Sequence, residues 1–204
     1  ALALGVQRMV KRHVLIRKLP SVETLGCATV ICSDKTGTLT QNEMMVRKIF
    51  VNGKIFDISG TGYAPEGNFT INGMPLSEID QRIVKFFLGL GALCNNAHLK
   101  KDHNTWKVIG DPTEGAILTA AAKANIRKEG LWKKFPLLSE IPFDSERKKM
   151  ATVRKTPHSV LLVCEKGAAD VIVKDCTRIY MGGELRDLSE EDIRNILNEN
   201  NKMA

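Results

Sequence analysis

The sequence contains no uninterrupted run of about 20 apolar residues, the length that a helix needs to cross a bilayer. It also lacks internal repeats and low-complexity segments, which argues against solenoids, collagen-like chains and disordered linkers. Cysteines are few, odd in number and without a Cys-x-x-Cys pair: Cys27, Cys32, Cys94, Cys164 and Cys176. We therefore expect no disulfide scaffold but reduced, mostly buried thiols in a cytoplasmic compartment.

The remaining composition is that of an ordinary globular protein. Of the 204 residues, 43% are hydrophobic and 26% are charged, which is enough for one or two modest cores. The net charge of +7 is uneven, because residues 1–20 hold five basic residues and no acidic one. The rest of the chain is close to neutral and offers no broad basic face, so no nucleic acid partner is expected.

Residues 1–20 combine the apolar stub ALALGV with a basic, helix-like run. A transmembrane helix has this pattern near its cytoplasmic end, and an amphipathic helix on an acidic partner fits it equally well. The partly one-sided apolar residues predict a helix over 1–19 that ends before Pro20. The continuous apolar run CATVIC (27–32) then predicts a short buried parallel strand.

From residue 44 onward, strand patterns alternate with amphipathic helices. Asn52-Gly53 separates two strand-like runs, which predicts a hairpin with a primed turn. Ser77 and Asp111 are good helix caps, and Pro112 suits a first helical position. The other expected elements are a loop or short hairpin over 59–75, a polar loop at HLKKDHNTW leading into a strand over 105–110, strands over 136–143, 149–155, 159–166 and 178–181, a turn at 182–183, and helices over 77–93, 111–126, 167–176 and 189–201. The predicted fold is α+β, an antiparallel sheet with flanking helices.

Asp34 directly follows the predicted strand at 27–32, which places its carboxylate at the edge of an open α/β sheet where ligands usually bind. Gly37 permits a tight turn, so main-chain N–H groups and the hydroxyls of Thr36 and Thr38 can face an anion. A carboxylate in this setting can attack a phosphoryl group and form an aspartyl-phosphate, with Mg²⁺ offsetting the repulsion between them. For the short pattern Asp-x-Thr-Gly-Thr alone, an aspartate that caps a turn fits equally well.

The longer string CSDKTGTLTQN resembles the signature of P-type ATPases, which are haloacid-dehalogenase-like phosphotransferases. The preceding VQRMVKRHVLIRK and LPSVETLG resemble the stalk that joins the fourth transmembrane helix of these pumps to the phosphorylation domain. Farther along, GDPTEGAIL, PFDSERKKM and EKGAAD resemble the three signatures of the nucleotide-binding domain, in the family's order. The resemblance covers essentially the whole chain, and its wording is closest to calcium pumps of the sarcoplasmic-reticulum type and their bacterial relatives.

The resemblance implies a stalk helix with its connection over 1–26, the first strand and start of an α/β phosphorylation domain over 27–43, and a nucleotide-binding domain over 44–204. The sequence does not contain the family's TGD and GDGVND segments, its later nucleotide-domain strand with an arginine, the actuator domain or the membrane helices. These other parts of the same pump are the expected partners, together with ATP and a transported cation that the 204 residues do not bind.

By the same resemblance, Asp34 is the phosphorylated nucleophile, and Lys35 helps to neutralise the transferred phosphoryl group. The carboxylate of Asp34 and the backbone carbonyl of Thr36 would hold Mg²⁺. Hydrolytic relatives carry a second aspartate two residues after the nucleophile as a general acid and base, and a threonine cannot replace it near neutral pH. We therefore expect the aspartyl-phosphate to persist, as a pump requires.

The resemblance also implies how the nucleotide is held. Phe143 is the ring on which adenine stacks, and Glu114 accepts a hydrogen bond from the adenine amino group. Lys148 and Lys166 are the two lysines of the pocket, one near the phosphates and one at its base. Gly167 lets the backbone approach the nucleotide closely. Taken singly, these residues have simpler interpretations: a core phenylalanine, solvated turn lysines and a glutamate that offsets the helix dipole.

One position departs from the calcium-pump pattern. Two residues after the stacking phenylalanine the family has an arginine, whereas this chain has Ser145. Arg147 would therefore have to supply the phosphate contact that the family arginine makes.

The expected protein is the ATP-binding cytoplasmic portion of an integral membrane pump, an ion-translocating ATPase that phosphorylates Asp34 and transports a cation, with calcium indicated by the wording of the motifs. The 204 residues themselves should bind ATP without turning it over. Two alternatives belong to other classes. A stand-alone phosphatase of the haloacid-dehalogenase type would need an aspartate at position 36, where this chain has Thr36, and a nucleotide-binding module would have no chemistry of its own.

Overall fold

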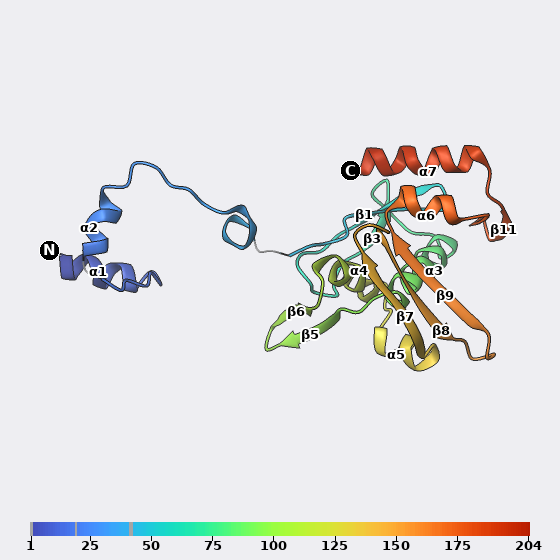
Figure 1. Ribbon diagram of the computed structural model, residues 1–204, viewed down its shortest axis with the longest axis horizontal. Helices are drawn as coiled ribbons and strands as arrows, with labels where there is room; N and C mark the ends of the chain where they lie inside the picture. The colour runs from blue at the N-terminus through green and yellow to red at the C-terminus, as the bar shows by residue number, and fades with distance from the viewer. Residues whose placement is uncertain (1, 19, 41–42) are drawn as a thin grey trace. The chain divides into compact units, whose positions relative to one another are not determined.

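In the computed structural model, residues 2–18, 20–40 and 43–204 are described, and the chain divides into two units, Ala1–Asn42 and Glu43–Ala204 (Figure 1). The first unit contains α1 (Leu2–Val10), α2 (Pro20–Gly26) and η1 (Lys35–Leu39), a short π-helical turn. Within the described residues, no helix combines the length and the apolar character that a membrane span requires.

The predicted helix over 1–19 is wrong in its length. Helix α1 ends at Val10, and His13 has a φ of 62°, a left-handed conformation through which a right-handed helix cannot continue. Pro20 begins α2 instead of following a helix, because a proline fits the first helical position, where its missing N–H would have had no partner.

The predicted buried strand over 27–32 is also wrong for this chain. These residues have no regular structure, and the exposed fractions of Val30 and Ile31 are 76% and 88%. A strand needs the backbone groups of a neighbour for its ladder of hydrogen bonds. In the described part of the chain, no strand pairs with this segment.

The second unit begins with a four-stranded antiparallel sheet in the order β1 (Lys48–Val51), β2 (Lys54–Ile58), β3 (Phe69–Ile71) and β4 (Met74–Pro75). Asn52-Gly53 joins β1 to β2, and Asn72-Gly73 joins β3 to β4. All four turn residues have positive φ, as a type I′ turn requires, so the predicted hairpin at Asn52-Gly53 is confirmed.

Helix α3 (Glu78–Leu93) is central to the packing of this unit. It contacts α4 (Pro112–Lys123), α5 (Lys128–Lys134), strand β1 and the three-stranded sheet described below. The predicted caps are confirmed, because the side chain of Ser77 accepts from Asp80 N, and that of Asp111 accepts from the N–H groups of Thr113 and Glu114. The main core between these elements consists of Ile49, Phe56, Ile58, Leu76, Val84, Leu88, Ala92, Ala97, Leu118, Ala120, Ala121 and Ala124.

The predicted polar loop from His98 is wrong, because the segment forms a hairpin of β5 (His98–Asp102) and β6 (Thr105–Ile109). Leu99 pairs with Val108, and both side chains pack against the main core. The other residues of β5 are polar, and His98, Lys100 and Lys101 are exposed, so Leu99 is the one apolar residue by which this strand could be recognised.

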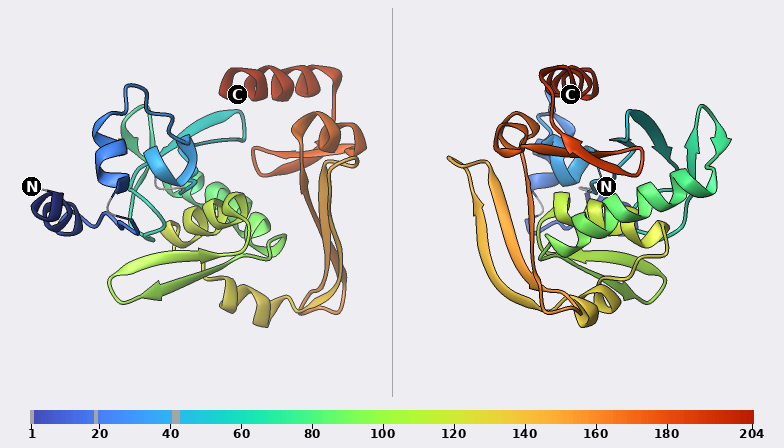
Figure 2. Two further views of the ribbon diagram at one scale, coloured as in Figure 1. Left: turned by 60° about the vertical axis from the view of Figure 1, so that its left-hand side comes forward. Right: turned by 90° about the vertical axis from the view of Figure 1, so that its right-hand side faces the viewer.

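Three long strands form the sheet that positions the candidate site. They are β7 (Leu137–Asp144), β8 (Lys149–Lys155) and β9 (Leu161–Gly167), antiparallel in that order, as the sequence predicted. Figure 2 shows them as a curved layer drawn in yellow and orange. A second, smaller core of Leu93, Cys94, Met150 and Cys164 lies between this sheet and the end of α3.

The chain continues with α6 (Ala169–Asp175), the hairpin of β10 (Arg178–Met181) and β11 (Glu184–Asp187), and α7 (Glu190–Met203). A reciprocal cap begins α7: Ser189 Oγ accepts from Asp192 N, and the Asp192 carboxylate accepts from Ser189 N. Arg186 donates two hydrogen bonds to the same carboxylate, at 2.6 and 2.8 Å. Antiparallel sheets with packed helices confirm the predicted α+β fold class.

Candidate functional site

Residues from three separate parts of the second unit come together at one end of the three-stranded sheet. The register pairs Asp144 with Lys149, Lys149 with Gly167, and Met150 with Lys166. The end of β7, the turn that contains Lys148 and the end of β9 therefore lie side by side. The first turn of α4 completes the group, because Glu114 contacts Lys166.

Glu114 and Lys166 form an ion pair, with 2.6 Å between Glu114 Oε1 and Lys166 Nζ. Both side chains are largely covered, with exposed fractions of 12% and 24%. Asp111 caps α4 and Pro112 opens it, which places Glu114 in the first turn, where the helix dipole also favours a carboxylate. The ion pair gives the site a fixed negative charge and a fixed positive charge in contact.

The second carboxylate oxygen of Glu114 is held by main-chain groups. Glu114 Oε2 accepts from Asn96 N at 2.9 Å and from Ala97 N at 3.1 Å. The side chain of the buried Asn95 donates to the carbonyl of Glu114 at 2.9 Å and accepts from Ala97 N at 3.0 Å. No motif in the sequence marks these residues; the polar pair Asn95-Asn96 soon after a helix is the signal that could have pointed to them.

Beneath this segment lies Lys128, which no sequence motif marks. Its exposed fraction is 7%, and its Nζ donates to the carbonyl of Ala97 at 2.6 Å. The amine lies 4.2 Å from the ring centroid of Trp132, and the guanidinium carbon of the fully buried Arg154 lies 4.6 Å from it. Burial, which disfavours the charged form, lowers the pKa of Lys128 to about 8.

Phe143 lies where the register of β7 and β8 shifts, between Ile141 and Asp144. The residue is 62% exposed although its side chain is large and apolar, so the simpler interpretation of a core phenylalanine does not hold. A ring exposed beside charged residues can stack on a planar base.

Lys148 lies in the turn after Asp144, with a φ of 54°. The carboxylate of Asp144 shapes this turn by accepting from the N–H groups of Glu146 and Arg147 at 3.0 and 2.8 Å. Arg147 donates to the carbonyl of Pro142 at 2.8 Å, which keeps its guanidinium at this turn. The exposed Ser145 stands where the family arginine was expected.

Gly167 is required by the strands themselves. A Cβ atom at this position would lie 2.4 Å from Lys148 O and 2.6 Å from Lys149 Cβ. The missing side chain of Gly167 therefore lets the end of β9 lie close to the start of β8.

The predicted phosphorylation residues belong to the first unit. Asp34 and Lys35 are exposed, whereas the side chain of Thr36 lies outside the described part of the structure. Gly37 has a φ of 74°, and its N–H donates to Thr40 Oγ1 at 3.3 Å. The Asp34 carboxylate and the Thr36 carbonyl are oxygen donors of the type that Mg²⁺ takes, but two donors fill only part of an octahedral shell. Among the described residues, no group of three or more His, Cys, Asp or Glu could hold a metal ion.

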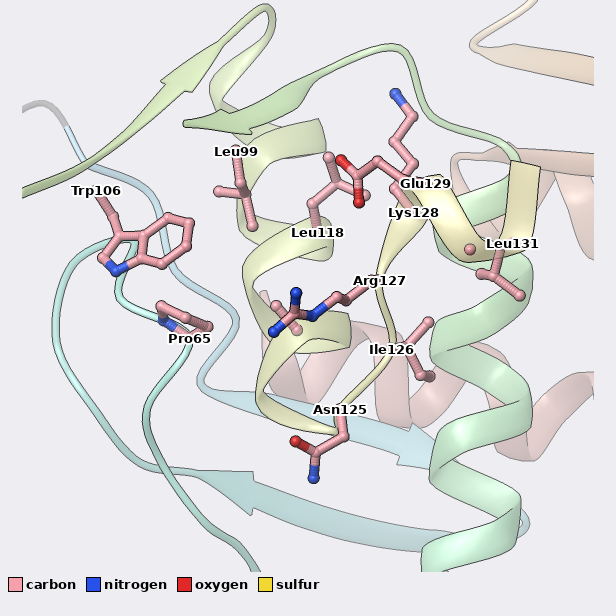
Figure 3. A pocket seen from close by; sticks show the side chains of 12 residues that line it. Pro65, Leu99, Trp106, Leu118, Asn125, Ile126, Arg127, Lys128, Glu129 and Leu131 are labelled. Atoms are coloured by element: carbon pink, nitrogen blue, oxygen red, sulfur yellow. The ribbon is translucent and has the colours of Figure 1, made fainter. Parts of the chain in front are cut away.

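A cavity of about 940 Å³ lies elsewhere in the second unit, between the β5–β6 hairpin and the segment of α4 and α5. Figure 3 shows Trp106 beside Pro65 at one side and the side chain of Arg127 in the middle. None of the predicted nucleotide residues lines it. The candidate site is therefore assigned from the functional groups of Glu114 and Lys166 and not from this cavity.

Comparison with known proteins identifies the family of the chain. The family model "P-type ATPase, cytoplasmic domain N" matches residues 84–204, more than half of the chain. Similar proteins include a calcium-transporting ATPase of Bacillus subtilis (44% identical over 191 residues), a probable cation-transporting ATPase F of Mycobacterium tuberculosis (42% over 196) and a calcium-transporting ATPase type 2C member 1 of Bos taurus (40% over 194). The matches cover 94%, 94% and 93% of this chain but only 22%, 21% and 20% of those relatives.

The match to the family includes both strands that carry the candidate site, the helix that carries Glu114 and the turn between β7 and β8. Mixed helices and antiparallel sheets fit that assignment. The chain therefore belongs to the P-type ATPase family and carries its cytoplasmic N domain.

Proposed function

We propose that this chain binds ATP at the end of the three-stranded sheet and that Asp34 accepts the terminal phosphoryl group within a P-type cation pump. The observation that carries the ATP site is that the strand register places an exposed aromatic residue, Phe143, at the same end of β7, β8 and β9 as Lys148 and the Glu114–Lys166 pair. A planar base and an anionic tail are the two parts of a nucleotide, and these residues match them.

Each residue has a defined task in this proposal. The ring of Phe143 stacks on adenine, which is worth about 1–3 kcal/mol. The Glu114 carboxylate accepts from the adenine amino group while its second oxygen stays on the backbone of Asn96 and Ala97. Lys166 lies at the base of the pocket, and Lys148, on the turn, reaches the phosphates. Gly167 serves the pocket by keeping β9 close to the start of β8.

The phosphoryl transfer rests on the first unit. An oxygen of the Asp34 carboxylate attacks the terminal phosphorus of ATP, the bond to the bridging oxygen breaks, and ADP leaves with that electron pair. Lys35 offsets the negative charge of the transferred group. Mg²⁺, which the Asp34 carboxylate and the Thr36 carbonyl would hold, supplies charge that offsets the repulsion between carboxylate and phosphate. No general acid or base stands at position 36, so the aspartyl-phosphate persists.

The names of the Bacillus subtilis and Bos taurus relatives support calcium as the transported ion. In this proposal the chain is a cytoplasmic portion of an integral membrane pump, and its partners are the pump's actuator domain, the remainder of its phosphorylation domain and its membrane helices. The cation binds elsewhere in the pump. The 204 residues alone bind ATP without turnover, because they hold only part of the Mg²⁺ site.

Titration of the 204-residue chain with ATP, followed by NMR chemical shifts, tests the proposal. Phe143→Ala should weaken ATP binding about tenfold or more, since it removes the stacking surface. Phe87→Ala is the matched control, because Phe87 is also an exposed ring but lies on α3. Equal losses in the two variants, or no binding to the unmodified chain, would refute the site.

A further inference from the structure

The ammonium group of Lys128 is buried between a backbone carbonyl and an aromatic ring. Its Nζ donates to Ala97 O at 2.6 Å and lies over the ring of Trp132. In the described part of the chain no carboxylate forms a salt bridge with Lys128, and Glu114 and Glu129 attract its charge only from farther away. A buried charge without a counter-ion in contact costs folding free energy, so packing alone does not account for a lysine at this place.

The carbonyl that Lys128 holds belongs to the residue that supports Glu114 from behind. Ala97 points its carbonyl at Lys128 and its N–H at Glu114 Oε2, 3.1 Å away. Ala97 is fully buried, and a Cβ at Gly110 would lie 3.0 Å from its Cα, so the segment is also packed against the start of α4. Lys128 is thus two hydrogen bonds away from the carboxylate of Glu114, through one residue.

These contacts fix the orientation of the Glu114 carboxylate and therefore the direction in which its Oε1 atom points. One oxygen is occupied by two main-chain N–H groups, and the other faces Lys166 and the site. An ionised carboxylate only accepts hydrogen bonds. Adenine presents an amino donor at the position where guanine presents a carbonyl acceptor. A carboxylate that cannot turn away would therefore favour adenine and repel guanine.

We propose that Lys128 is a positioning residue that, by holding Ala97, keeps the Glu114 carboxylate in place and so sets the preference of the site for adenine over guanine nucleotides. This inference rests on the proposed ATP site. Lys128 does not touch the nucleotide, and it acts only through the 95–97 segment.

The test compares the affinities of the 204-residue chain for ATP and for GTP. Lys128→Met keeps the length and apolar body of the side chain but removes its donor and charge. The ratio of ATP to GTP affinity should fall by about tenfold in this variant, because a released carboxylate discriminates less. The loss should come mainly from weaker ATP binding, and the melting temperature should not fall. Lys133→Met, at an exposed position on the same helix, is the control and should keep the ratio.

An unchanged ratio in a folded Lys128→Met variant would overturn the inference and leave the ATP site standing. A chain that binds neither nucleotide would instead refute the site itself. If Lys128→Met does not fold, the uncharged and shorter Lys128→Gln variant decides: its ratio should also fall, and a ratio equal to that of the unmodified chain would count against Lys128.

Discussion

Glu114 and Lys166 are 52 residues apart in the sequence, yet Glu114 Oε1 and Lys166 Nζ lie 2.6 Å apart. One side chain comes from the first turn of a helix and the other from the end of a strand, so the pair joins α4 to the three-stranded sheet. Because both groups are mostly covered, removing one leaves the other without its counter-charge in a place that water reaches poorly.

Glu114→Gln should lower the free energy of unfolding by about 1–3 kcal/mol, since the neutral amide cannot balance the charge of Lys166. Urea denaturation at neutral pH measures this. Glu129→Gln is the control, because Glu129 is exposed on α5 and its replacement should change stability by less than about 0.5 kcal/mol. Similar values for the two variants would contradict a structural role for the pair.

Gly167→Ala should destabilise the second unit by about 1–3 kcal/mol, because the added methyl group would overlap the carbonyl of Lys148 and force β8 and β9 apart. Gly130→Ala offers a matched comparison within α5. No atom lies within 4 Å of a Cβ at Gly130, so there the change should stabilise by about 0.5–1 kcal/mol through its effect on helix entropy. Thermal unfolding of both variants gives the two opposite signs.

An element can be predicted from the sequence when the contacts that stabilise it are made between residues close together in the chain. Ser77 and Asp111 cap helices through hydrogen bonds to residues two or three positions away, and the turn at Asn52-Gly53 depends on those two residues. Such features were predicted correctly because their physical cause lies within a few residues. The strand at 27–32 was not, because a strand exists only with a partner, and no partner can be inferred from an apolar run.

The candidate site shows the same division. Glu114, Phe143, Lys148 and Lys166 were named because motifs carry them, and the structure brings them to one end of a sheet. Lys128 looked like any lysine of the basic stretch KEGLWKK, and α5 itself was missed because Gly130 interrupts the helical pattern. Its burial depends on Ala97 and Trp132, and only the tertiary structure places Ala97, 31 residues away, beside it.

The stability of the chain should rise with pH between about 8 and 10.5 by an amount that depends on Lys128. Burial lowers the pKa of Lys128 from an unfolded value of 10.5 to about 8, so in this interval the unfolded chain binds more protons than the folded one. Burying the charged amine lowers the free energy of unfolding by roughly 2–4 kcal/mol below pH 8, and this cost disappears as the pH rises toward 10.5. Glu114 and Glu129 oppose the shift, and Arg154 and Lys166 add to it.

Lys128→Met isolates this effect from other groups that titrate in the same range. Urea denaturation should find the variant more stable than the unmodified chain at pH 7, with the difference shrinking toward pH 10. A difference that does not vary with pH would mean that the pKa of Lys128 is not lowered in the folded chain.

ATP should bind the 204-residue chain weakly and almost independently of Mg²⁺. Stacking on Phe143 contributes about 1–3 kcal/mol, and each charge-assisted contact about 1.5–3 kcal/mol. Lys166 is already paired with Glu114, so part of its contribution is offset before ATP arrives. Association costs at least about 4 kcal/mol, and a surplus near 4 kcal/mol corresponds to a dissociation constant of about 1 mM.

Asp34→Ala should leave this affinity nearly unchanged, in contrast to Phe143→Ala, because in the proposed site the second unit holds the nucleotide and Asp34 belongs to the first. NMR titrations of both variants, with and without Mg²⁺, compare the two ends of the nucleotide. If the unmodified chain bound ATP tightly and Asp34→Ala lost that affinity, most of the binding free energy would come from contacts with the phosphates and a metal ion. In that case the stacking ring and the Glu114–Lys166 pair would orient the base without supplying most of the affinity.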